Sequence, residues 1–179
     1  MTKAAQRERS VRIRSFAAAD AREVGELFIA VNRLLAPPDR REAFEAYIAR
    51  ALAEEMDRIT DYYAEHDGGF WVAIAEDRVV GIFGLERASP EAMELRRMYV
   101  TPTLRRRGIA RLMLAAAEAE CRRRGFHRLE LSTSELQPAA LALYRNSGYA
   151  LVREVVAAKI SNKTVGDGIR RYYLEKGLA

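Results

Sequence analysis

The residues with the clearest potential for chemistry form a basic turn, Arg105-Arg106-Arg107-Gly108-Ile109-Ala110. A strand is expected before it, over residues 92–100, and apolar residues at helical spacing follow it. The first backbone N–H groups of a helix lack internal partners and lie at the positive end of its dipole, so this arrangement can bind a pyrophosphate. The sequence contains neither G-x-x-x-x-G-K-S/T, for nucleoside triphosphates, nor G-x-G-x-x-G, for dinucleotides. The anion must therefore belong to another kind of ligand.

Composition narrows the class of protein. The chain has 179 residues, 49% of them hydrophobic and 31% charged, which is typical of one folded domain. Cys121 is the single cysteine, and His66 and His127 are isolated, so we expect no disulfide, no metal site and a reducing compartment. No apolar run has the length of a signal peptide or a membrane span, which predicts a cytoplasmic protein without a membrane partner. The net charge of +5 favours an acidic partner.

Periodicity predicts a single α/β domain with a mixed sheet over residues 1–179, of which residues 1–10 are expected to be a flexible tail. The expected element order is β-α-α-β-β-β-α-β-α-β-β. Strands are expected at residues 11–16, 70–75, 79–85, 92–100, 129–132, 149–157 and 168–174, and helices at 20–35, 39–63, 109–125 and 138–148.

The turn resembles the central motif of the GNAT superfamily of acetyl-CoA-dependent N-acetyltransferases, which reads Q/R-x-x-G-x-G/A after a strand with a V-x-P-like end. Arg105, Gly108 and Ala110 match this motif in order and position. Residues 137–149 resemble the family's N-x-x-A-x-x-L-Y-x-x-x-G-F/Y helix, with Gln137 in place of the commoner Asn and with Tyr144 retained. Both motifs lie on the expected elements, so the resemblance implies the GNAT acyl-CoA N-acyltransferase fold over nearly the whole chain.

The resemblance implies that acetyl-CoA, as a co-substrate, lies between two splayed parallel strands, here residues 94–100 and 129–132. Backbone groups of the first strand are then expected to meet the pantetheine arm, and N–H groups of the turn to hold the pyrophosphate. The residues expected to bind acetyl-CoA are Met98, Tyr99, Val100, Arg105, Arg106, Arg107, Gly108, Ile109, Ala110 and Gln137.

Direct transfer to a primary amine in a ternary complex requires a base and an acid. A lysine-like amine has a pKa near 10.4, so at neutral pH a base or a water chain must remove its proton. Glu94 is the first candidate for this base, because its place resembles that of the carboxylate in histone-type members of the family, and Glu86 is the second. Tyr144 matches the family's usual proton donor to the leaving thiolate.

The acceptor is left open between a small amine, an amino acid and a peptide N-terminus, and a homodimer is compatible with the resemblance. By resemblance, the early helices and late loops are expected to form the acceptor site, around residues 35–39, Tyr62, Tyr63, Phe70 and Trp71. A non-catalytic acyl-CoA-binding regulatory module is the main alternative, although it would need neither Glu94 nor Tyr144. Nucleic-acid binding is disfavoured, because the sequence has no recognition-helix pattern and no basic stripe interleaved with aromatic residues.

Overall fold

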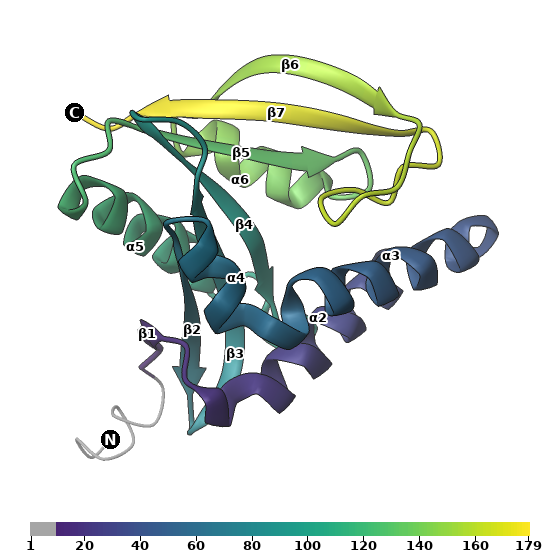
Figure 1. The fold of residues 1–179 in the computed structure, drawn as a ribbon, viewed down its shortest axis with the longest axis horizontal. Coiled ribbons are helices and arrows are strands. Elements are labelled where there is room, and N and C mark those ends of the chain that lie inside the picture. Colours follow the sequence, from purple (N-terminus) through teal and green to yellow (C-terminus); the bar gives the residue numbers. More distant parts are fainter. Residues whose placement is uncertain (1–9) are drawn as a thin grey trace.

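A seven-stranded mixed sheet forms the centre of the computed structural model, which describes residues 10–179 (Figure 1). The strand order is β1-β2-β3-β4-β5-β7-β6, and every neighbouring pair is antiparallel except β4 and β5, which are parallel. The strands are β1 (Arg12–Ser15), β2 (Gly69–Ala75), β3 (Arg78–Arg87), β4 (Ala92–Val100), β5 (Arg128–Ser134), β6 (Ala150–Ala157) and β7 (Ile169–Gly177). The tail expected over residues 1–10 lies almost entirely outside the described residues.

Helices cover both faces of the sheet and create two apolar cores. The helices are α2 (Ala21–Leu35), α3 (Arg41–Glu54), α4 (Ile59–Glu65), α5 (Ile109–Arg123) and α6 (Pro138–Asn146). One core gathers apolar residues of α2, α3 and α4 against β2 and β3. The other gathers residues of α5 and α6 against the central strands. No helix in the described part of the chain has the length and apolar character needed to cross a membrane.

The expected fold class is confirmed, but one expected helix is interrupted. The apolar period continues from α3 into α4, yet the backbone leaves the helical region at Glu55, where φ is −140° and ψ is −59°. The Glu55 side chain is fully buried and bonded to arginines of β4. This tertiary interaction prevails over local helix propensity, so residues 10–179 contain one more α-helix than the sequence predicts.

The connection between β2 and β3 is tighter than expected. Only Glu76 and Asp77 separate the strands, and both have positive φ, 49° and 57°, as a type I′ turn requires. The rest of the predicted order is found as expected, with α5 directly after the basic turn and α6 directly after Gln137.

A β-bulge in β4 and an early end to its pairing with β5 shape the middle of the sheet. Arg96 pairs with Gly84 and Tyr99 with Ile82, so β4 holds one more residue than β3 there, and Arg97 has a φ of 54°. The parallel pairing with β5 covers only residues 92–95 and 128–131. Beyond these residues β4 and β5 run apart (Figure 1).

Candidate active site

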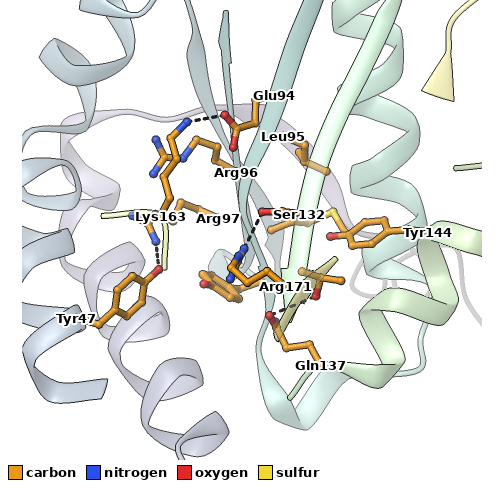
Figure 2. Close-up of a pocket in the computed structure, with 13 residues that line it drawn as sticks. Tyr47, Glu94, Leu95, Arg96, Arg97, Ser132, Gln137, Tyr144, Lys163 and Arg171 are labelled. Carbon is orange, nitrogen blue, oxygen red and sulfur yellow. Dashed lines mark hydrogen bonds and ion pairs between the residues drawn. The ribbon is translucent and has the colours of Figure 1, made fainter. Parts of the chain in front are cut away.

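A cavity of about 70 Å³ lies where β4 and β5 separate (Figure 2). Residues 94–99 of β4 and 132–133 of β5 form its walls, with Tyr47 of α3, Gln137, Tyr144 of α6, Lys163 and Arg171 of β7. The lining therefore combines a carboxylate, tyrosine hydroxyls and cationic groups at a place where main-chain groups of two strands are not paired with each other. The arrangement can hold an extended ligand and place a polar group beside it.

Five of the residues singled out from the sequence come together in this cavity. Glu94, Met98 and Tyr99 line it from β4, and Gln137 and Tyr144 line it from the start and middle of α6. Gln137 immediately precedes Pro138, and its backbone N–H donates to the Ser134 carbonyl at 3.0 Å. Val100 lies further along β4, paired with Gly81, and is not part of the lining.

The basic turn leads into α5 beyond the end of β4 and is separate from the lining of the cavity. Arg106 and Gly108 both have positive φ, 63° and 79°, and Gly108 is the N-terminal cap of α5. The first bond of the helix is donated by Leu112 to the Gly108 carbonyl at 3.0 Å. The N–H groups of residues 109–111 precede this bond and are thus available to an anion. A Cβ placed on Gly108 would meet nothing within 4 Å, so a ligand can approach its backbone closely.

Tyr144 lies with its ring in the apolar core beside α5 and its hydroxyl toward the separated strands (Figure 2). The side chain is 5% exposed and packs edge-on against Tyr149, with ring centroids 5.9 Å apart. Burial raises the pKa of the Tyr144 hydroxyl above its usual value, and the positive charge of Arg171 opposes this shift. The group therefore stays protonated at neutral pH and can donate a proton.

Glu94 and Glu86 differ in their surroundings although Lys163 bonds both. The Lys163 ammonium lies 2.6 Å from Glu94 Oε2 and 2.7 Å from Glu86 Oε1. Glu86 is buried outside the cavity and also accepts bonds from Arg96 at 2.7 Å and Tyr62 at 2.9 Å. Burial opposes the ionisation of Glu86, but Arg96 and Lys163 outweigh it and lower the pKa of the carboxyl to about 2. The geometry thus favours Glu94, which faces the cavity, as the group that can exchange a proton with a ligand.

Two buried arginines also line the cavity. They were not identified as site residues from the sequence. Arg96 and Arg97 are consecutive, yet both guanidinium groups bond the Glu55 carboxylate, at 2.8 Å and 2.7 Å. In a regular strand their side chains would point to opposite faces, and the bulge brings both to the face that α3 and α4 cover. Tyr47 and Tyr63 complete the cluster through bonds to Arg97 and Glu55. An adjacent pair of arginines within a mostly apolar central strand is a signal for this cluster, because buried charges require partners.

Several residues expected near the acceptor have structural roles instead. Phe70 packs against Phe16 and Tyr63, and Trp71 stacks on Phe83 in the opposite core, with ring centroids 5.3 Å apart. Tyr62 and Tyr63 belong to the buried hydrogen-bond cluster. Of residues 35–39, Leu35 lines a second cavity, described below.

Cys121 is buried in the α5 core, and burial raises the pKa of its thiol to about 12. The thiol is therefore protonated at neutral pH and packs as a small apolar side chain.

The second cavity, of about 40 Å³, adjoins the first on the face that α2 and α3 cover. Asn32 and Leu35 of α2, Phe44 of α3 and residues 164–165 line it, and Tyr47, Tyr99, Gln137 and Arg171 are common to both cavities. Arg171 lies at the junction, where its Nη2 donates to Ser132 Oγ at 2.7 Å.

A mixed sheet that opens between two parallel strands, with a helix N-terminus beyond the opening, defines the acetyltransferase fold class. Solved structures of this class superpose well. The PaiA N-acetyltransferase of Thermoplasma acidophilum, in complex with coenzyme A, matches with a TM-score of 0.73 at 18% identity over 94% of this chain and 99% of that one. A GNAT-family acetyltransferase of Staphylococcus aureus Mu50 matches with a TM-score of 0.70 at 20% identity, over 95% and 100% of the two chains.

The sequence model described as the acetyltransferase (GNAT) family matches residues 37–149, and the chain belongs to this family. N-acetyltransferase 8 of Homo sapiens is 31% identical over 115 residues, which are 61% of this chain and 51% of the relative. N-acetylaspartate synthetase of Danio rerio is 32% identical over 116 residues, 64% of this chain and 41% of the relative. The chain thus spans about half the length of the curated relatives it matches.

Proposed function

We propose that this protein transfers the acetyl group of acetyl-CoA to a primary amine of a small molecule, amino acid or peptide, by direct attack in a ternary complex. The observation that carries the proposal is the separation of β4 from β5 after Leu95 and Leu131, which opens on a cavity lined by Glu94 and Tyr144. The structural relative in complex with coenzyme A has the same fold and supports the choice of co-substrate.

The residues present fit acetyl-CoA at two places. The N–H groups over residues 106–110 lie at the start of α5, and the open space around Gly108 suits a pyrophosphate. The backbone of residues 98–100 follows the bulge, where β4 no longer pairs with β5. These main-chain groups would bind the amides of a pantetheine arm, and Gln137 would contact it from the start of α6. Acetyl-CoA supplies an activated acetyl thioester.

In this proposal Glu94 acts as the general base and Tyr144 as the general acid. Glu94, directly or through water, takes the proton from the acceptor ammonium, which gives the nitrogen a free lone pair. The nitrogen forms the new C–N bond, the C–S bond breaks, and Tyr144 donates its proton to the leaving sulfur. The nitrogen then loses its second proton, which restores the Tyr144 hydroxyl directly or through water. The Lys163 ammonium lies between Glu86 and Glu94, so there is room for a primary ammonium group against these carboxylates. The acceptor must displace Lys163 from Glu94 or reach this carboxylate beside it.

Calorimetric titration with acetyl-CoA, with ATP and NAD as controls, tests the co-substrate. We expect micromolar binding of acetyl-CoA alone, and its loss in Gly108→Glu, which places an anion at the pyrophosphate site. Gly125→Glu is the matched control, because Gly125 ends the same helix, has a φ of 80° against 79° for Gly108, and also has no neighbour within 4 Å of an added Cβ. Equal loss in both variants would point to backbone strain rather than to the binding site.

Release of thiol in the presence of a panel of primary amines then tests catalysis. Binding of acetyl-CoA without thiol release from any amine would identify the protein as the non-catalytic acyl-CoA-binding module. A folded sample that binds neither acetyl-CoA nor longer acyl-CoAs would refute the proposal.

A further inference from the structure

We infer that the acceptor amine carries a carboxylate, which Arg171 binds, so that the substrate class is that of amino acids and related amino-carboxylates. The inference rests on the proposed function and adds the chemistry of the acceptor to it. It follows from the charge balance of the two cavities and from the place of Arg171 between them.

Arg171 differs from the other cationic groups of the site in having no acidic partner. Arg96 and Arg97 bond Glu55, and Lys163 bonds Glu86 and Glu94. Within residues 10–179, no acidic side chain forms an ion pair with Arg171, whose Nη2 donates to the neutral Ser132 hydroxyl. The second cavity has no acidic residue in its described lining. A half-buried guanidinium with donors to spare and no counter-ion is a binding site for a carboxylate, which it can hold through two parallel hydrogen bonds.

The position of Arg171 on β7 places it on the acceptor side of the sheet. Successive side chains of a strand point to opposite faces of the sheet. Leu174 belongs to the core beside α5, and Tyr172 packs against that core. Arg171 therefore points to the other face, toward α2 and α3, where the second cavity lies. Figure 2 shows its side chain beside Ser132, between Gln137 and the strands. An acceptor can thus place its amine in the cavity with Glu94 and Tyr144 while its carboxylate meets Arg171, because both cavities share this residue.

The test compares amines that differ only in the carboxylate. L-amino acids and their primary amides are assayed in pairs for thiol release from acetyl-CoA, and we expect at least one free acid to have a KM about ten- to a hundredfold below that of its amide, the range of one charge-assisted hydrogen-bond pair. The amide has the less basic amine, which is neutral more often at pH 7, so amine reactivity alone would favour the amide. Equal or better turnover of every amide would overturn the inference and leave the proposed function intact.

Arg171→Gln should abolish the preference for the acid over the amide, chiefly through a higher KM for the acid. Arg171→Lys keeps the positive charge but lacks the planar guanidinium group, so it should retain part of the preference for the acid over the amide. This variant keeps the test valid if Arg171→Gln folds poorly. Arg170→Gln is the matched control, since Arg170 is the neighbouring residue on β7 and pairs with Glu154 at 3.0 Å on the surface. Equal losses for acid and amide in Arg171→Gln, or the same effect in Arg170→Gln, would refute a carboxylate contact. Acetyl-CoA binding without thiol release from any amine would instead remove the proposed function, and the inference with it.

Discussion

The buried carboxylate of Glu55 gives the sharpest prediction about stability. Its side chain is fully buried and accepts bonds from Arg96 at 2.8 Å, Arg97 at 2.7 Å and Tyr63 at 2.7 Å. Glu55→Gln preserves the shape but removes the negative charge. It leaves Arg96 with Glu86 as its acidic partner, and Arg97 with none among the described residues. Breaking a buried ion pair costs about 3–5 kcal/mol. For a chain of this size we therefore expect a Tm lower by about 6–20 °C.

Urea unfolding and thermal melting of the variant measure this effect, and α3 provides a matched control. Glu45 accepts two bonds from Arg33, at 2.7 Å and 3.0 Å, but both side chains are at least half exposed. Solvent screens such a pair, so Glu45→Gln should change the unfolding midpoint little. The two glutamates have similar bond lengths and differ mainly in burial. A midpoint that moves no further for Glu55→Gln than for Glu45→Gln would refute the claim that the buried cluster joins α3 and α4 to β4.

Two further predictions concern the site itself. Tyr144→Phe should lower kcat about a hundredfold, the scale of general acid catalysis, with the Kd for acetyl-CoA unchanged, as steady-state kinetics and calorimetry can determine; an unchanged kcat would assign the donor role elsewhere. The pKa of Glu86 is lowered from 4.5 to about 2 in the folded protein, so its ionisation stabilises the fold above pH 4.5 and this contribution, about 3 kcal/mol, is lost as the pH falls toward 2. The difference in unfolding free energy between wild type and Glu86→Gln should accordingly shrink over this pH range, and a constant difference would contradict the lowered pKa.

Local patterns in the sequence predict most of the fold. Apolar periodicity gives the strands and helices, and glycine and proline mark most of their ends. The interruption at Glu55 could not be predicted in this way, because the helical period continues through it and the cause is a pair of arginines some 40 residues away. The bulge at Arg97 could not be predicted either, because its positive φ occurs at a residue other than glycine.

In the candidate site, too, local motifs could be predicted from the sequence and tertiary contacts could not. The turn at Gly108 and the helix with Tyr144 are continuous motifs, so the sequence identifies them directly. Arg171 and Lys163 reach the cavity only through the pairing of β7 with β5 and the loop before it, and the sequence carries no local sign of either contact. Glu94 and Glu86 look alike as residues near the ends of neighbouring strands, and only the buried partners of Glu86 distinguish them.

The separation of β4 and β5 also determines where the sheet has unpaired strand edges. Unpaired strand edges normally lie at the outer borders of a sheet, where proteins protect them against association. This sheet has two more edges in its interior, along β4 beyond Leu95 and along β5 beyond Leu131. The opening is thus a template for β-augmentation, on which any extended chain with main-chain-like amides can form an additional strand. A pantetheine arm, with its two amides, could pair with both interior edges and so leave fewer main-chain groups unpaired in the middle of the sheet.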